Sequence, residues 1–349
     1  MMFKIISSLL AATATATATT TTDIATHDIT EHFVWEHFTS FQERFHKRYD
    51  NFETMRERFD IFKTNWLDIQ RHNSDSTQNF TMGINQFTDL TPDEFNEKYL
   101  GGIVQERNLV GLYGCDAFAS NKDASSFPDT VDWRREGAVT PVKDQGQCGS
   151  CWSFSATGAM EGAWATSTGD LVSLSEEQLT DCATGFKYGS HGCNGGQMDG
   201  AFKYAIENGA TSEDQYPYSA GKGQTGECEQ SDVESVATFT GCYDVAPNDQ
   251  VSLKAAVSKQ PVSIAIEADT RYFQSYSSGI LTSSDCGTSL DHGVLIVGYG
   301  EDKGQKYWLV KNSWSNTWGD EGYVKIARSD SRNDKGICGI AMQPSFISV

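Results

Sequence analysis

Basic residues are scarce in this sequence. Its 349 residues include 27 Lys and Arg against 47 Asp and Glu, so the formal net charge at pH 7 is −20. Each contact with a nucleic-acid phosphate normally requires a Lys or Arg side chain. The composition therefore argues against a nucleic acid as a partner of this chain.

Long apolar runs are also missing. A membrane-spanning helix needs about 20 consecutive apolar residues, and no stretch provides them, so we expect no membrane anchor. A short apolar run at residues 5–10 follows Lys4, precedes small residues and resembles a secretory signal peptide, which we place at residues 1–22. We therefore expect the secretory pathway, with the lysosome, the vacuole or the cell exterior as destination. Disulfides are then permissible, and nine cysteines leave at least one thiol unpaired.

The length of the chain predicts two to three folding units. In residues 28–73, apolar and aromatic side chains recur at helical spacing, and the polar turn at residues 49–51 divides them into two amphipathic helices. Asp28, with Glu31 three residues later, is expected to cap the first helix. We assign residues 28–100 to a helical domain and residues 101–126 to a linker.

After position 127, helical patterns come first and strand patterns second. Residues 154–164 and 198–206 predict helices that end at Gly169 and Gly209. Ser175 and Gln178 together predict a capping box that starts a third, short helix. Apolar segments rich in β-branched and aromatic residues predict strands at residues 262–266, 294–299, 307–310 and 323–326. The order predicts an α+β fold with a helical half followed by a β-rich half.

Two cysteines three residues apart, Cys148 and Cys151, are the most informative feature. Such a pair is compatible with half a zinc site, a redox pair or two disulfide partners. A zinc site needs a second close pair of ligands, but Cys182 and Cys193 lie far apart and His191 stands alone among glycines. A thioredoxin-like pair needs a βαβ context, whereas this pair opens a helix. The remaining interpretation is a nucleophile, Cys151, at a helix N-terminus that favours its thiolate.

A thiolate nucleophile needs a base, and His292 has the best context of the seven histidines because it opens an apolar strand. Asn312 follows the next strand and could accept a hydrogen bond from the imidazole, shielded by Trp314. Gln145, in a loop before Cys151, could supply an oxyanion donor beside the Cys151 backbone N–H. Taken singly, such residues are more often structural, so the catalytic prediction rests on their combination.

These residues resemble the papain and cathepsin family of cysteine proteases. The run Cys-Gly-Ser-Cys-Trp at positions 148–152 matches the family signature, which has a His and an Asn some 130–150 residues later, and Asn312 lies slightly beyond that interval. The resemblance covers residues 127–349. It implies a papain-like fold of two subdomains, one helical and one β-barrel-like, and an endopeptidase that acts on proteins or peptides as a monomer, with no cofactor and no metal.

The resemblance also assigns the substrate cleft. It implies that Gly195 and Gly196 line the cleft, where the missing Cβ atoms let the substrate backbone pair with the enzyme backbone. It further implies a pocket that prefers an apolar side chain at the second residue before the scissile bond, the P2 residue, with Gln343 at its floor. The full implied set is Gly195, Gly196, Met198, Ala265, Leu290, Asp291, Trp314 and Gln343. One departure from the family is Ser315, where a Gly usually follows the Trp.

Upstream, residues 28–100 resemble the inhibitory propeptide of the cathepsin L-like branch. The resemblance implies a zymogen whose own propeptide covers the cleft as an intramolecular inhibitor, with processing in residues 101–126. The positions that match the two propeptide motifs are Arg58, Ile61, Phe62, Asn65, Ile69 and Asn73, then Gly83, Asn85, Phe87 and Asp89. Asn79 begins an Asn-Phe-Thr glycosylation acceptor within this propeptide.

The family pattern also implies disulfides. The implied pairs are Cys148–Cys193, Cys182–Cys228 and Cys286–Cys338. Cys115 and Cys242 have no counterpart in that pattern, and we hypothesise that they pair across the propeptide boundary and tether the released propeptide. Two alternative functions stay open: an exopeptidase, although no occluding insertion is visible, and an inactive relative that binds peptides or acts as an inhibitor.

Overall fold

The computed structural model describes residues 20–101, 103, 110–283 and 286–349, without the side chains of residues 20–30 and 232. The expected signal peptide lies, up to residue 19, outside the described residues. The helices are α1 Thr20–Arg44, α2 Phe52–Ser74, α3 Pro92–Tyr99, α4 Cys151–Thr168, α5 Glu176–Cys182, α6 Met198–Asn208, α7 Gln250–Val257 and α8 Arg271–Gln274. The strands are β1 Phe80–Met82, β2 Asp116–Phe118, β3 Val131–Asp132, β4 Gly241–Val245, β5 Val262–Ile266, β6 Tyr276–Leu281, β7 His292–Asp302, β8 Gln305–Lys311, β9 Tyr323–Ala327 and β10 Ser345–Ser348.

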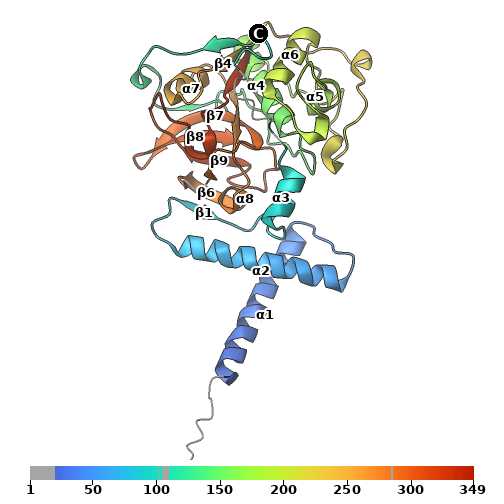
Figure 1. Cartoon of the computed structure of the whole chain (residues 1–349), viewed down its shortest axis with the longest axis vertical. Helices are drawn as coiled ribbons and strands as arrows, with labels where there is room; N and C mark the ends of the chain where they lie inside the picture. Colours follow the sequence, from blue (N-terminus) through green and yellow to red (C-terminus); the bar gives the residue numbers. More distant parts are fainter. Residues whose placement is uncertain (1–19, 102, 104–109, 284–285) are drawn as a thin grey trace, which may run out of the picture.

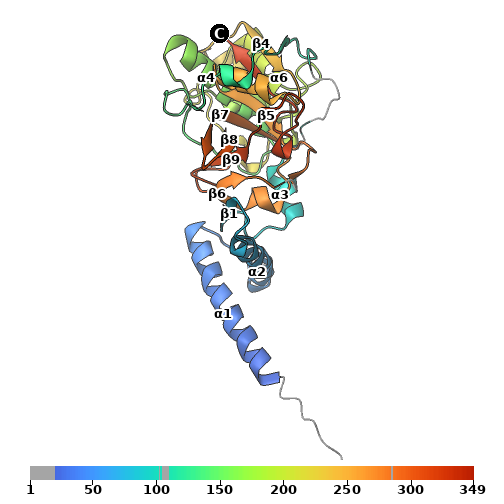
Figure 2. The same ribbon diagram turned by 90° about the vertical axis from the view of Figure 1, so that its left-hand side faces the viewer.

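Helices α1 and α2 cross outside the main body of the molecule (Figures 1 and 2). The turn predicted at residues 49–51 is confirmed, because Asn51 caps α2 by accepting a hydrogen bond from the Thr54 backbone N–H. The cap predicted at Asp28 is wrong, since α1 already begins at Thr20 and no Gly or Pro interrupts the chain between them. The two helices share a small core formed by Val34, Phe38, Phe41, Phe59 and Phe62.

Three helices, α4, α5 and α6, gather on one side of the main body (Figure 1). Their predicted ends are confirmed. Gly169 follows α4 with a φ of 85°, and Gly209 follows α6 with a φ of 76°, conformations that favour glycine. The Ser175 hydroxyl accepts from the Gln178 backbone N–H at the start of α5. Helices α5 and α6 bury their apolar faces in one core with α4.

The strands described form one ten-stranded sheet with the order β1-β6-β9-β8-β7-β5-β10-β4-β2, and β3 pairs with β7. The four predicted strands are confirmed as β5, β7, β8 and β9. Both ends of this sheet come from upstream of position 127: β1 pairs antiparallel with β6, and β2 pairs parallel with β4. The upstream region therefore supplies both edge strands of the sheet.

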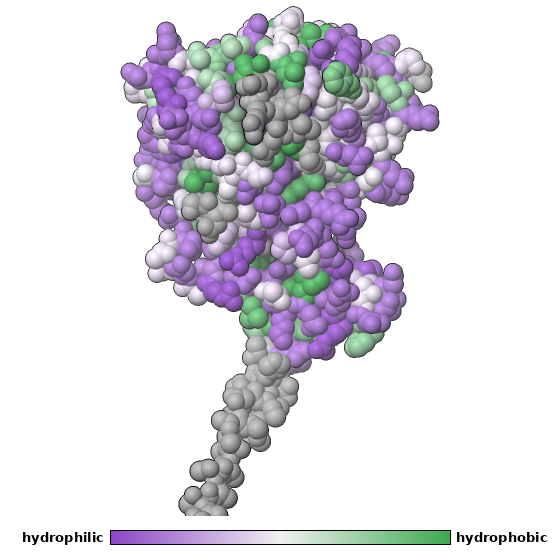
Figure 3. Space-filling view, in the orientation of Figure 1, coloured by the Kyte–Doolittle hydropathy of each residue, from purple (hydrophilic) through white to green (hydrophobic). Residues whose placement is uncertain are grey.

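The molecule is α+β, as predicted, with a helical half and a β-rich half that each surround their own apolar core. The face seen in Figure 3 is mainly hydrophilic, and its apolar residues are scattered. None of the described helices is long and apolar enough to cross a membrane. The line where the two halves meet, between the start of α4 and the start of β7, holds the candidate site.

Candidate active site

Cys151 is the first residue of α4 and the only one of the nine cysteines that forms no disulfide. Its thiol is fully buried. Burial raises the pKa of this thiol to about 11, and the backbone groups of Gly293 and Gly101 offset only part of that rise. In this covered form the thiol is therefore neutral at pH 7.

His292 is the first residue of β7 and is also fully buried. Its Nε2 lies 2.8 Å from Oδ1 of Asn312, and the Trp314 ring stacks on the imidazole with 4.5 Å between centroids. Because Oδ1 only accepts, Nε2 must carry the proton, which leaves Nδ1 bare. Burial lowers the pKa of His292 to about 4, so this imidazole is neutral at pH 7.

The two halves bring the cysteine and the histidine together through Gly293. A Cβ added at Gly293 would lie 3.1 Å from the Cys151 carbonyl oxygen, so a glycine here lets β7 approach the helix closely without displacing it. Among the described residues, Nδ1 of His292 has no hydrogen-bond partner. Nδ1 of His292 is therefore free to accept a proton.

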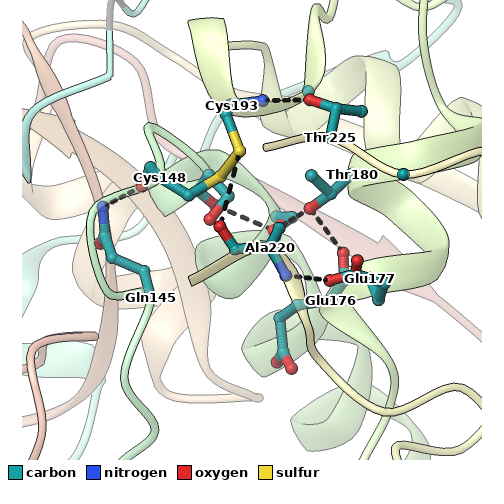
Figure 4. Close-up of a disulfide and its surroundings, with 12 residues drawn as sticks. Gln145, Cys148, Glu176, Glu177, Thr180, Cys193, Ala220 and Thr225 are labelled. Carbon is teal, nitrogen blue, oxygen red and sulfur yellow. Dashed lines mark hydrogen bonds between the residues drawn. A yellow bond between two sulfur atoms is a disulfide. The ribbon is translucent and has the colours of Figure 1, made fainter. Parts of the chain in front are cut away.

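Gln145 is fully buried in the loop before α4. Its Nε2 donates to the Cys148 carbonyl at 2.9 Å (Figure 4) and to the Tyr99 carbonyl at 3.0 Å. Its Oε1 accepts from the Ser313 hydroxyl at 2.7 Å, which fixes which way the amide points. Sequence reasoning missed Ser313, although it stands between Asn312 and Trp314 in the motif that carried the prediction. Three consecutive residues thus organise the site: Asn312 orients His292, Ser313 orients Gln145, and Trp314 stacks on the imidazole.

The structure forms all three disulfides that the resemblance implied, and also joins Cys115 to Cys242. The Cys148–Cys193 bond links the loop before α4 to the turn before Gly195 (Figure 4). Gly195 has a φ of 102°, which an L side chain rarely adopts. A Cβ at Gly196 would lie 2.6 Å from the Trp152 ring. Gly195 is thus favoured by its backbone conformation and Gly196 by the side chains packed against it, and both are compatible with a cleft.

Most of the remaining residues implied for the cleft are apolar. Met198, Ala265 and Leu290 share one buried cluster, and Oε1 of Gln343 is buried with no partner among the described residues. Asp291 accepts a hydrogen bond from the Ala268 backbone N–H, while burial raises the pKa of its carboxyl to about 7. The three apolar members therefore belong to one buried core.

The upstream region covers this site. Besides the bond from Gln145 to the Tyr99 carbonyl, the Gln86 amide donates to the Trp314 carbonyl at 2.7 Å. Phe87 packs edge-on against the Trp314 ring at 5.4 Å between centroids. A Cβ at Gly101 would collide with the Gly149 carbonyl. The backbone at Gly101 therefore lies in direct contact with the loop that precedes Cys151. In the sequence, Gly101 only indicated a loose connection.

One group of metal-ligating residue types lies together within the described ranges: Cys115, Asp199 and Asp244. The sulfur of Cys115 is bonded to Cys242, so it offers no thiolate ligand. Burial, followed by the neighbouring Asp244 carboxylate, raises the pKa of Asp199 to about 7. The group is thus a pair of buried carboxyls that favours sharing a proton.

Comparison with known families identifies both the main body of the molecule and the upstream region that covers the site. The profile described as "Papain family cysteine protease" matches residues 127–348, more than half of the chain. The chain belongs to the papain family of cysteine proteases. The profile described as "Cathepsin propeptide inhibitor domain (I29)" matches residues 38–95, so this papain-family chain carries an inhibitory propeptide domain ahead of its peptidase domain.

Relatives of this papain-family chain include plant enzymes. It is 46% identical over 301 residues to "Probable cysteine protease RD21C" of Arabidopsis thaliana, covering 86% of this chain and 65% of that relative. It is 46% identical over 299 residues to "Germination-specific cysteine protease 1" of the same plant, covering 83% and 76%. The chain thus spans slightly less than two thirds of the first of these relatives.

Solved precursor structures match this papain-family chain closely. The "Recombinant stem bromelain precursor" superposes with a TM-score of 0.82 at 39% identity, covering 90% of this chain and 99% of that chain. A digestive procathepsin L 3 from the midgut of Tenebrio molitor larvae superposes with a TM-score of 0.79 at 40% identity, with the same coverage. Both matches extend over propeptide and peptidase together.

Proposed function

We propose that this chain is the zymogen of a cysteine endopeptidase in which Cys151 is the nucleophile and His292 the base. The observation that carries the proposal is the 2.8 Å contact between His292 Nε2 and Asn312 Oδ1, which leaves Nδ1 bare on a residue whose neighbour, Gly293, packs against the backbone of Cys151, the only cysteine outside a disulfide. A nucleophile, a base and a group that orients the base form the arrangement required for acyl transfer.

The reaction follows from these positions. Once the cleft is open, Nδ1 of His292 takes the Cys151 proton, and the thiolate forms a bond to the peptide carbonyl carbon. Gln145 Nε2 and the Cys151 backbone N–H stabilise the oxyanion. His292 then donates the proton to the amine as the C–N bond breaks, leaving a thioester. Water loses a proton to His292, attacks the thioester and releases the acid and the thiol.

The propeptide inhibits by using the same donor. Gln145 Nε2 already donates to the Tyr99 carbonyl at 3.0 Å, so a substrate carbonyl must compete with the propeptide backbone for it. Gly101 then continues over the Gly149 carbonyl next to the nucleophile. Inhibition therefore combines a steric cover with occupation of the oxyanion donor.

We propose a preference for an apolar P2 residue. Met198, Ala265 and Leu290 are apolar side chains of one buried cluster, and burying one further methylene against such side chains is worth about 0.8 kcal/mol. Gln343 adds one acceptor, because its Oε1 has no partner among the described residues. The pocket thus favours Leu, Val or Phe and tolerates a side chain that ends in a donor.

We further propose that the chain acts as a monomer in the secretory pathway, in a vacuole, a lysosome or outside the cell. Four disulfides support an oxidising compartment. Asn79, which we propose carries an N-linked glycan, is exposed at the edge of the propeptide strand β1. Digestion with an N-glycosidase would shift the mass of the zymogen if the glycan is present.

The test is a fluorogenic assay after acid activation, with an end-blocked peptide that carries Phe or Leu at P2. We expect cleavage by the wild-type chain and none by Cys151→Ala, because the thiolate forms the covalent intermediate. Replacing the P2 residue with Asp should lower kcat/KM at least tenfold. Equal activity in Cys151→Ala would contradict the assigned nucleophile.

The same assay distinguishes the alternatives. An exopeptidase would leave the end-blocked peptide intact and trim an unblocked one. A chain that only binds peptides would cleave neither, although a fluorescent peptide would still bind to the processed protein.

A further inference from the structure

We propose that residues 110–126, which we call the strap, stay on the peptidase after activation, and that the inhibitory helices are released only by a cut N-terminal to Cys115. This inference rests on the zymogen function proposed above. It concerns which part of the upstream chain leaves and which part becomes a permanent piece of the enzyme.

The strap is attached covalently. Cys115 is bonded to Cys242, a residue of β4 in the peptidase domain, and both cysteines are 4% exposed. A cut between Cys115 and position 127 would therefore leave everything upstream of it bound to the enzyme. A tethered inhibitor rebinds at a high effective concentration, so such a cut alone should not activate the enzyme.

The strap also completes the sheet. Its strand β2 pairs in parallel with β4 and forms the outermost strand there. The Ala246 backbone N–H donates to the Phe118 carbonyl at 2.8 Å, and the Phe118 ring packs edge-on against Phe346 at 5.2 Å between centroids. Loss of the strap would expose the edge of β4 and the ring of Phe346. An exposed strand edge beside an apolar side chain favours aggregation.

Peptidase side chains hold the rest of the strap through its backbone. Arg332 donates to the Ser120 carbonyl at 2.7 Å, and the Ser120 N–H donates to the Ser252 hydroxyl at 3.0 Å. Near the end of the strap, the buried Lys254 donates to the Ala124 carbonyl at 2.9 Å. Near its start, the Gly111 N–H donates to the Asp244 carboxylate at 2.7 Å. The docking thus extends along the strap and does not depend on the disulfide alone.

The attachment can be measured without any self-cleavage. Two zymogens with Cys151→Ala would carry the recognition sequence of a site-specific protease, one in place of residues 104–109 and one in place of residues 119–124. After cleavage, both are run on denaturing gels with and without dithiothreitol. We expect the first to release the inhibitory fragment without reductant and the second to keep its full mass until dithiothreitol is added.

The matched control adds Cys115→Ser and Cys242→Ser to the second zymogen, which should then release its fragment without reductant. Release without reductant from the zymogen that keeps both cysteines would overturn the tether. These gels need no activity, so they remain decisive if the proposed function fails.

The wild-type chain gives the second readout. After acid activation, the intact mass of the non-reduced enzyme should include the strap, as an N-terminal extension or as a disulfide-linked peptide. A mature enzyme that starts near position 127 and lacks Cys115 would overturn the proposal.

Discussion

The upstream chain holds the peptidase domain in two different ways. The inhibitory region, residues 31–101, is attached by hydrogen bonds, aromatic contacts and the strand β1, none of which is covalent. The strap is attached by a disulfide as well as by β2. A single cut of the chain therefore allows the inhibitory region to dissociate, whereas the disulfide keeps the strap on the edge of the sheet.

The largest effect should be on the reactivity of the nucleophile. With the inhibitory region in place, the Cys151 pKa is about 11, so about one thiol in 10⁴ is ionised at pH 7. Alkylation of the zymogen by iodoacetamide at pH 7 should be about 10³-fold slower than that of the processed enzyme. All other cysteines are in disulfides, so incorporation reports this thiol alone.

The pH profile supplies the control. Since the folded pKa lies far above 7, the zymogen rate should rise tenfold per pH unit between pH 7 and 9, while the processed enzyme should stay nearly flat. Equal rates in the two forms would show that the inhibitory region does not change the ionisation of the thiol.

In the proposed mechanism Gln145 donates to the substrate oxyanion as well as to the Tyr99 carbonyl of the inhibitory region, so Gln145→Ala should weaken both catalysis and inhibition. Loss of one oxyanion donor lowers kcat by about 10²–10³. The affinity of the processed enzyme for a peptide of residues 31–101 should fall roughly tenfold, because the Tyr99 carbonyl loses one hydrogen bond. Inhibition kinetics with the processed enzyme measure both values.

The matched control is Gln147→Ala, an exposed glutamine of the same loop. It should change kcat and affinity by less than about twofold. A Gln145→Ala enzyme that loses kcat but binds the peptide unchanged would mean that the Tyr99 contact does not contribute to inhibition.

A smaller effect should come from the ion pair between Arg58 and Glu94 in the inhibitory region. Nη1 and Nη2 of Arg58 donate to the carboxylate, at 2.7 and 2.6 Å, and this hydrogen bonding lowers the pKa of Glu94 to about 2. The pair therefore stabilises the folded region fully above pH 4.5, and this contribution is lost as the pH falls towards 2. Glu94→Gln should cost about 1 kcal/mol of unfolding free energy at pH 7.

Urea unfolding of Cys151→Ala zymogens measures this cost without self-processing. Glutamine keeps one acceptor oxygen for the Thr91 backbone N–H, so the change removes the charge and one of the two hydrogen bonds from Arg58 but not the cap. The deficit should shrink between pH 4.5 and 2. Glu97→Gln, an exposed position of the same helix, should change little, and a deficit that persists at pH 2 would contradict the ion-pair explanation.

Local patterns in the sequence predicted the elements that local chemistry determines. The glycines at the ends of α4 and α6 and the polar turn before α2 need only neighbouring residues, and these were found where expected, although the cap predicted at Asp28 was not. The strands β2 and β4 were not predicted, because they are short and are stabilised by pairing between distant segments. The same reason hid the roles of Tyr99 and Ser313, since each contacts a residue far away in sequence.

The smallest effect should come from Ser315, the departure from the family that the sequence revealed. Its φ is 64°, a left-handed conformation that costs a non-glycine residue about 1 kcal/mol. Ser315→Gly should relieve this strain but increase the entropy of the unfolded chain, for a net gain of about 0.5 kcal/mol and a rise in Tm of roughly 1–2 °C by calorimetry. Ser315→Ala keeps the strain and should give no gain. Both variants lack the hydroxyl and keep the backbone N–H that donates to the Lys143 carbonyl. A gain of equal size in both would therefore mean that removal of the hydroxyl, and not relief of the backbone strain, stabilises the chain.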